Sequence, residues 1–328
     1  MSSTTYDLLG IGNAIVDVVV PTPDTFLAQH GLQKGGMALI SSDQAEALYA
    51  AMPPGRESSG GSAANTCAVA AGLGARVAFL GTVASDQLGG VFQHDIKAAG
   101  VHFPSAPLQG GLPTARCLIA VTPDGQRTMN TFLGACVSFG PESLDLKLIE
   151  ASAVTYLEGY LFDPPSCQAA FRQAAEVAHA AGRQVALTLS DAFCVHRHRA
   201  AFLELVEHGV DILFANEAEI CALYEAKSFD EAAAHAARHV SLAALTRSAA
   251  GSVILHAGQQ IPVAAEPTKV VDTTGAGDAY AAGFLAAHAR GVGLAGCGRL
   301  GSLAAAAAIG QYGARPDVDL RALAGQVG

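Results

Sequence analysis

After residue 150 the chain alternates short apolar segments with Ala-rich segments of helical periodicity, and this alternation limits the fold more than any other feature. Six segments have the length and apolar character of buried strands, namely Val154–Leu157, Val185–Leu189, Asp211–Phe214, Leu242–Thr246, Ser252–His256 and Ile261–Ala264. Between them the pattern predicts helices near Ser166–Ala181, Arg199–His208, Glu217–Tyr224 and Asp230–His239. We therefore predict an α/β fold with a doubly wound, mostly parallel sheet, which binds ligands beyond the carboxyl ends of its strands.

The first part of the chain predicts a second, smaller sheet, because some of its strand patterns have no helix between them. These patterns lie at Ile11–Val20, Met37–Ser41, Ala115–Thr122 and Thr128–Leu133. Pro123-Asp124-Gly125 favours a hairpin turn between the last two. We expect one domain over residues 1–328, with the small sheet contributed by two excursions of the chain, about 11–45 and 110–138.

Composition argues against several classes of protein. The net charge is -10 and the 19 basic residues are scattered, so we expect no nucleic-acid partner. The seven cysteines include no C-x-x-C pair, which favours reduced thiols in a cytoplasmic protein. We expect a monomer or a homodimer. Asp17 interrupts the apolar stretch near the N-terminus, and the charge-free run between Arg299 and Arg315 is short. We therefore expect neither a signal peptide nor a membrane span.

The strongest chemical signal is the motif Asp-Thr-Thr-Gly-Ala-Gly-Asp at residues 272–278. It follows a predicted strand, Lys269–Val271, and precedes a helical pattern over Ala279–Arg290. This order brings free backbone N–H groups and the positive end of a helix dipole to one point, which can bind phosphate. Asp278 beside that point suits a base that deprotonates an alcohol during phosphoryl transfer. The alternative is that Asp278 only caps the helix.

A glycine pair, Gly60 and Gly61, precedes another helical pattern, which ends at Gly72. The pair lets the backbone approach a ligand closely, and the amide of Asn65 in the first helical turn would project nearby. The alternative is a flexible turn in which Ser62 is the helix N-cap.

The segment Gly10–Asp17 imitates the dinucleotide fingerprint G-x-G-x-x-G, but Ile15 occupies the third glycine position. We therefore reject a Rossmann cofactor site there. Asp17 lies inside an apolar strand pattern, where an unpaired carboxylate is costly. Two neighbouring sugar hydroxyls would satisfy it, with help from Asn13. The alternative is an internal salt bridge.

The segment Asn216-Glu217-Ala218-Glu219 begins a helical pattern directly after a predicted strand. Its carboxylates could orient a hydrated Mg²⁺ or could simply complement the helix N-terminus. His235 and His239 lie one helical turn apart without a third ligand, so we expect surface histidines and not a zinc site. The chain has no G-K pair for a Walker A loop and no G-x-S-x-G nucleophile elbow.

These motifs resemble the ribokinase-like (PfkB) family of carbohydrate and nucleoside kinases. The two signature regions of the family match Gly60–Gly100 and Asp272–Ala289, in the same order and separation, and the resemblance covers nearly the whole chain. It implies a ribokinase-like fold in which the small sheet is a lid, and an enzyme that uses ATP with Mg²⁺.

The resemblance also implies roles for individual residues. Asp278 is then the catalytic base, and the anion hole is formed by Gly275, Ala276 and Gly277. The positions that match substrate-binding residues are Asn13, Asp17, Gly61 and Asn65. Asn216 and Glu219 match the N-x-x-E motif for the metal and phosphates. Arg127 resembles a lid residue that can meet the transferred phosphate.

The ATP segment departs from the pattern of the family at one position. The family has T-x-G-x-x-G, whereas this chain has Thr246, Ser248 and Gly251, with serine in place of the first glycine. We still expect ATP to bind, but the backbone conformation at the serine is left open. A monovalent-cation site is implied by the resemblance alone, around Asp272, Thr274 and Gly313.

Within the family, three segments look closest to adenosine kinases, namely Gly12–Asp17, Leu189–Phe193 and Phe214–Glu219. The segment Glu158–Leu161 would then lie near the purine, with Tyr160 either as a stacking face or as an ordinary core residue. We predict phosphorylation of the 5′-hydroxyl of a nucleoside, most of all adenosine. The alternatives are a kinase for ribose, fructose or a keto-deoxy sugar acid, and a nucleoside- or sugar-binding protein without catalysis.

Overall fold

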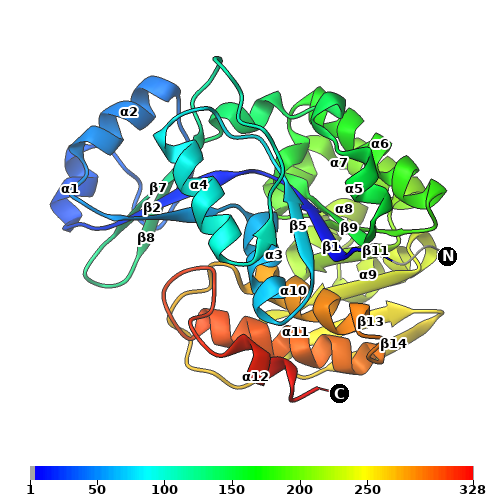
Figure 1. Cartoon of the computed structure of the whole chain (residues 1–328). Coiled ribbons are helices and arrows are strands. Elements are labelled where there is room, and N and C mark those ends of the chain that lie inside the picture. Colours follow the sequence, from blue (N-terminus) through cyan, green and yellow to red (C-terminus); the bar gives the residue numbers. More distant parts are fainter. Residues whose placement is uncertain (1–3, 328) are drawn as a thin grey trace.

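The structure is a computed structural model that describes residues 4–327, and within them the chain forms two β-sheets (Figure 1). The large sheet has nine strands in the order β14-β13-β12-β11-β10-β9-β1-β5-β6. Their bounds are β1 Tyr6–Ile11, β5 Val77–Leu80, β6 Val101–His102, β9 Ser152–Glu158, β10 Gln184–Thr188, β11 Ile212–Asn216, β12 Leu242–Thr246, β13 Ser252–His256 and β14 Gln259–Val263. The strands from β12 to β6 are parallel, and β13 and β14 are antiparallel. The predicted fold class is confirmed.

Helices cover both faces of the large sheet. One face carries α3 Ser62–Gly72, α4 Gln87–Ala98, α10 Ala276–Ala289 and α11 Leu294–Ile309. The other carries α5 Leu146–Glu150, α6 Pro165–Ala180, α7 Ala192–Gly209, α8 Glu217–Tyr224 and α9 Phe229–His239. In β1, Leu8 packs into the core on the first face and Leu9 into the core on the second. Because successive side chains of a strand point to opposite faces, a continuous apolar run fills both cores.

The remaining helical segments are short. They are α12 Leu320–Ala324 and the 3₁₀ segments η1 Gly134–Ser138, η2 Pro141–Ser143, η3 Gly159–Phe162 and η4 Ser248–Ala250.

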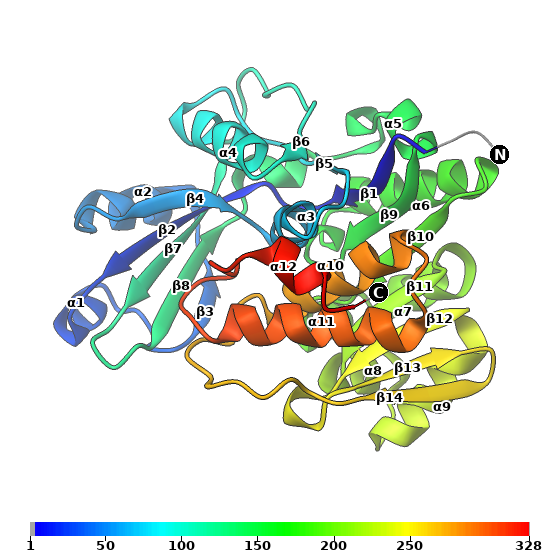
Figure 2. The same ribbon diagram turned by 60° about the horizontal axis from the view of Figure 1, so that its bottom comes forward.

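The small sheet projects from one end of the large sheet, as Figures 1 and 2 both show. Its strand order is β3-β8-β7-β2-β4, with bounds β2 Ile15–Pro21, β3 Met37–Leu39, β4 Arg56–Gly60, β7 Ala115–Val121 and β8 Arg127–Phe132. Helices α1 Asp24–Gln29 and α2 Ser42–Ala51 add Phe26, Leu27 and Leu48 to the apolar core that includes Val16 and Val18. The expected hairpin joins β7 to β8, where Thr122 N–H donates to the carbonyl of Gln126 at 3.0 Å. Strand β4 lies outside the segments expected for this sheet.

Three predicted elements differ from the structure. The single strand expected at Ile11–Val20 is wrong, because the chain leaves the large sheet after β1 and enters the small sheet as β2. Lys269–Val271 is not a strand: the N–H of Val271 bonds the carbonyl of Ile309 at the end of α11, and Val270 is 57% exposed. Helix α7 begins seven residues before the expected start, and its backbone departs from helical geometry at His198.

No helix within residues 4–327 is long and apolar enough to cross a bilayer. The seven cysteines are free thiols, and six of them are buried.

Candidate active site

Several of the predicted site residues lie at or just beyond the carboxyl ends of neighbouring strands in the large sheet. Asn13 follows β1, Tyr160 follows β9, Asn216 ends β11 and Thr246 ends β12. Asn216 and Thr246 are paired in the parallel ladder of β11 and β12. Parallel strands end at one edge of a sheet, which is the ligand-binding edge in doubly wound folds.

The turn before α10 has the geometry that its glycines predict. Gly275 is the N-cap with φ of 74°, and a Cβ atom there would lie 2.6 Å from the Cα of Ala314. In the described part of the chain, the N–H groups of Gly275 and Gly277 have no hydrogen-bond partner, and that of Ala276 makes a long bond of 3.3 Å to the carbonyl of Thr273. These N–H groups, at the positive end of the helix, can therefore receive an anion.

Asp278 lies in the first turn of α10, and α3 holds its carboxylate. Ser62 Oγ donates to Oδ1 at 2.6 Å, and Asn65 Nδ2 approaches Oδ2 at 3.5 Å. Burial raises the pKa of Asp278 to about 6, although both hydrogen bonds lower it. At neutral pH the carboxylate is mostly ionised and can accept a proton. Across residues 4–327 it accepts no bond from its own helix, so simple capping does not describe its contacts.

The start of α3 explains how Ser62 reaches Asp278. Gly61 and not Ser62 is the N-cap, with φ of 98°. A Cβ atom on Gly61 would lie 2.2 Å from the carbonyl oxygen of Asn13, so this position requires glycine. The alternative of Ser62 as the N-cap is therefore wrong, and its hydroxyl is free to orient Asp278.

Asp17 lies on β2, near enough to Asp278 for its charge to raise the pKa of Asp278. Its carboxylate packs against Gly60, and none of the ion pairs or hydrogen bonds found within residues 4–327 involves it. The internal salt bridge is thus not formed. Burial raises the pKa of Asp17 to about 6, while the charges of Arg315 and Arg127 lower it. A ligand with hydroxyl donors would satisfy this carboxylate.

Glu158 is a buried acid whose role the sequence did not reveal. Its carboxylate accepts hydrogen bonds from Asn13 Nδ2 and from the N–H of Ala63, both at 2.7 Å. Burial raises its pKa to about 7. Asn13 is therefore turned toward Glu158, and contact of Asn13 with a substrate stays a prediction that would use its Oδ1 or its second N–H.

Asp272 has partners of its own chain at both carboxylate oxygens. Oδ1 accepts from the N–H and the hydroxyl of Thr274, and Oδ2 accepts from the N–H of Gly313 at 3.0 Å. Arg127 Nε also lies 3.0 Å from Oδ2, as an ion pair without hydrogen-bond geometry. The residues expected around a monovalent cation are thus close together, and the cation site stays a prediction. In this arrangement Arg127 contacts Asp272.

The Asn216 and Glu219 pair forms a capping box at the start of α8. Asn216 Oδ1 accepts from the N–H of Glu219, and Glu219 accepts from both the N–H and the amide of Asn216. Burial raises the pKa of Glu219 to about 7. The described residues contain no cluster of His, Cys, Asp or Glu that could hold a metal directly. Contact of Glu219 with a hydrated Mg²⁺ stays a prediction.

Tyr160 is partly buried, and its surroundings are polar. Its N–H donates to Ser190 Oγ at 3.1 Å, and the carboxylate of Asp191 lies near its hydroxyl. Burial, followed by the negative charge of Asp191, raises the pKa of the Tyr160 hydroxyl. The two interpretations of its ring, stacking face or core residue, both stay predictions.

The ATP segment adopts the conformation that its family pattern requires despite the serine. Ser248 has φ of 49°, a value that suits glycine and costs other residues about 1–2 kcal/mol. Gly251 has φ of 82°, and a Cβ atom there would lie 2.1 Å from the carbonyl oxygen of Val263. The backbone is thus glycine-like at both positions, with some strain at Ser248.

Arg315 is a further site residue that the sequence did not identify. It lies beyond α11 and contacts Asn65 through Nε at 2.9 Å. No sequence motif marks it, because its partner is 250 positions away.

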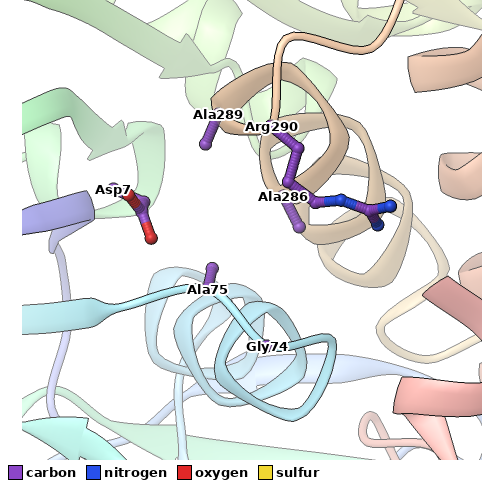
Figure 3. A pocket seen from close by; sticks show the side chains of 6 residues that line it. All are labelled: Asp7, Gly74, Ala75, Ala286, Ala289 and Arg290. Atoms are coloured by element: carbon purple, nitrogen blue, oxygen red, sulfur yellow. The ribbon is translucent and has the colours of Figure 1, made fainter. Parts of the chain in front are cut away.

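A cavity away from these residues, shown in Figure 3, plays no part in this arrangement. Its lining includes Asp7, at the start of β1, and Arg290, just after α10. Since Asp278 lies at the start of α10, this cavity is at the opposite end of that helix.

The chain is similar to known kinases along most of its length. The family model described as pfkB family carbohydrate kinase matches residues 42–321. The structure of an adenosine kinase from Sinorhizobium meliloti is 54% identical with a TM-score of 0.90, over 98% of this chain and 99% of that chain. A probable sugar kinase protein from Rhizobium etli CFN 42 is 47% identical with a TM-score of 0.91, over 98% of each chain. An ATP-dependent ribose-1-phosphate kinase from Halopiger xanaduensis is 31% identical over 70% of this chain and 73% of that protein.

Proposed function

Since the chain belongs to the pfkB family of carbohydrate kinases and is a phosphotransferase with an alcohol acceptor, we propose that it transfers the γ-phosphoryl group of ATP to the 5′-hydroxyl of adenosine. The observation that carries the proposal is the pair of neighbouring carboxylates, Asp17 and Asp278. Asp278 has oriented partners beside free backbone N–H groups, and Asp17 has no hydrogen-bond or ion-pair partner within residues 4–327. An acceptor that carries both an alcohol and a neighbouring diol could place the alcohol at Asp278 and the diol at Asp17.

In this mechanism Asp278 accepts the proton of the 5′-hydroxyl as the oxygen attacks phosphorus. The N–H groups of Gly275 and Gly277 stabilise the charge of the transferring phosphoryl group. Mg²⁺, held by the phosphates and by water near Glu219, would supply further charge neutralisation when bound. Arg127 would reach the phosphoryl group only after leaving Asp272.

The acceptor is proposed from Asp17 and from the similarity to the Sinorhizobium meliloti adenosine kinase. Asp17 would accept hydrogen bonds from the two ring hydroxyls of a ribose, and the 5′-hydroxyl would then point toward Asp278. The second candidate is a sugar or sugar phosphate, because the chain is also similar to a probable sugar kinase and to a ribose-1-phosphate kinase. Either acceptor leaves the roles of Asp278 and the glycine turn unchanged. Free cysteines suit the reducing cytoplasm, where we expect the enzyme to work in purine salvage.

The test is ADP formation by purified enzyme with MgATP and single acceptors: adenosine, 2′-deoxyadenosine, guanosine, ribose, ribose 1-phosphate and fructose. Adenosine should have the highest kcat/KM. Ribose or fructose turned over as efficiently as adenosine would replace the nucleoside proposal with the sugar-kinase one. ADP formation with none of them would favour a binding protein.

The catalytic assignment is tested by Asp278→Asn. We expect the variant to bind adenosine and lose about 10²–10⁴-fold in kcat. The control is Asp319→Asn, because Asp319 caps α12 and Asn caps a helix equally well. Undiminished turnover of a folded Asp278→Asn variant would reject Asp278 as the base.

A further inference from the structure

We propose that Arg315 is a positioning residue for the acceptor site, which fixes the amide of Asn65 so that its nitrogen faces Asp278. The inference rests on the proposed function, because it assumes that Asp278 removes the proton of the acceptor alcohol.

The guanidinium of Arg315 joins three elements. Nε donates to Asn65 Oδ1 on α3 at 2.9 Å, and Nη2 donates to Ser59 Oγ on β4 at 2.9 Å. Nη1 contacts Asp95 Oδ2 on α4 at 3.2 Å, and the same carboxylate oxygen accepts from the N–H and the hydroxyl of Ser59. The guanidinium of Arg315 is thus held in one orientation by partners from the core and from the small sheet.

Asn65 lies between a group that only donates hydrogen bonds and a group that only accepts them. A guanidinium has no acceptor, so Asn65 must present Oδ1 to Arg315. The amide nitrogen then faces Asp278 Oδ2, an ionised acceptor, at 3.5 Å. Without Arg315 the amide could turn over and place its oxygen against the carboxylate. The long contact leaves Oδ2 as the less engaged oxygen of Asp278 and the better placed one to take a proton.

The backbone before Arg315 supports the anion turn as well. Ala314 packs against Gly275, and the N–H of Gly313 donates to Asp272. Three consecutive residues therefore contact the glycine turn, the acid before it and the amide of Asn65, so a displaced Arg315 would disturb the geometry of phosphoryl transfer.

The charge of Arg315 acts on Asp278 together with several other groups. The groups that face Asp278 are Asp17 from β2, Asn65 and Ser62 from α3, Tyr156 and Glu158 from β9, Tyr160 from η3 and Glu219 from α8. Among the charged groups that act on Asp278, Asp17 raises its pKa and Arg315 lowers it. Removing the charge of Arg315 should therefore raise the pKa of Asp278 and move the acidic limb of kcat/KM to higher pH.

The experiment compares Arg315→Gln, Arg315→Lys and the control Arg321→Gln, with adenosine and MgATP. Arg321 is an exposed arginine six positions on, in α12. Arg315→Gln should lower kcat by about tenfold to a hundredfold, the effect of one charged hydrogen bond, and shift the acidic limb upward. Arg315→Lys keeps the positive charge but lacks the planar guanidinium. The acidic limb of kcat/KM should therefore return to its wild-type pH, while kcat stays reduced. Arg321→Gln should match the wild type in both readouts.

A double-mutant cycle separates positioning from general damage to the fold. In the Asn65→Ala background, Arg315→Gln should lower kcat by less than about threefold, because the shared interaction is already lost. An additive loss of kcat, or an acidic limb of Arg315→Gln that coincides with the wild type, would overturn the proposal. If the wild type phosphorylates adenosine and Asp278→Asn does not, the proposed function holds, and these outcomes test only the positioning role of Arg315. If the wild type phosphorylates no acceptor, the proposed function fails and this inference fails with it.

Discussion

Two glycines of the anion turn, only two positions apart, should respond in opposite ways to the same substitution. A Cβ atom on Gly275 would lie 2.6 Å from the Cα and the carbonyl oxygen of Ala314, and the backbone there has φ of 74°. A Cβ atom on Gly277 would have no neighbour within 4 Å, and Gly277 has no positive φ. The structure therefore requires glycine at 275 for the fold, whereas glycine at 277 leaves open space beside the N–H groups.

These contacts set the expected magnitudes. For Gly275→Ala, the unfavourable φ costs about 1–2 kcal/mol and the overlap with Ala314 about 1–3 kcal/mol. The free energy of unfolding should therefore fall by about 2–5 kcal/mol. For Gly277→Ala, the helix gains at most about 1 kcal/mol from the better helix former. Its methyl group would occupy the space that the transferring phosphoryl group needs, so kcat should fall by about 10²–10³-fold, as when an oxyanion contact is lost.

Urea unfolding followed by circular dichroism measures the first quantity, and steady-state ADP formation measures the second. The reasoning predicts a destabilised Gly275→Ala variant and a stable but nearly inactive Gly277→Ala variant. Wild-type kcat in Gly277→Ala would show that the phosphoryl group does not enter this space. A wild-type unfolding midpoint in Gly275→Ala would refute the packing argument.

Three further changes test other parts of the site. Ser248→Gly should relieve the strain of the positive φ and raise the free energy of unfolding by up to about 1 kcal/mol in urea titrations, with the KM for ATP unchanged. Arg127→Gln should break the ion pair with Asp272 and speed amide hydrogen exchange in β7 and β8 of the ligand-free enzyme, and equal exchange would show that the pair does not hold the small sheet. The stability of the ligand-free enzyme should fall as pH rises from about 4 to about 6, because the pKa of Asp17 is 3.8 unfolded and about 6 folded, so the folded state binds its proton more tightly. Asp278 contributes a slope of the same sign, so Asp17→Asn should reduce the slope without abolishing it, and should shrink the preference for adenosine over 2′-deoxyadenosine. An unchanged slope would show that Asp17 does not titrate in this range.

The sequence predicted the fold best where the limits of an apolar run coincide with changes of structure. Leu242–Thr246, Ser252–His256 and Glu217–Tyr224 were predicted with the bounds of β12, β13 and α8. The prediction failed at Ile11–Val20, because the apolar pattern continues while the chain passes from one sheet to the other. Where the chain changes direction, the missing Cβ of Gly61 leaves room for the carbonyl of Asn13. That contact joins segments far apart in the chain, and no local pattern reports it.

The same limit applies to the site. The glycines around Asp278 marked the anion turn, because a local motif suffices to build it. Ser62, Glu158 and Arg315 were missed as site residues because their roles depend on partners 95 to 250 positions away. A serine after two glycines looks like a cap, and an arginine in a loop looks like a surface charge.

The site is also where the chain departs most from the rules that stabilise the rest of the fold. Three carboxylates of the site, the buried Glu158 and the partly buried Asp17 and Asp278, have pKa values raised mainly by desolvation, and each would destabilise the folded state when ionised. Glu158 is compensated inside the protein by two donors, and Asp278 in part by Ser62 and Asn65. Asp17 has no hydrogen-bond or ion-pair partner within residues 4–327, so a ligand with hydroxyl donors can bond it directly. A diol would supply two of them at once, and binding it would recover the stability that an ionised, unpaired Asp17 costs. This is the physical reason to expect that the enzyme binds a ribose tightly and discriminates against an acceptor that lacks one of the two hydroxyls.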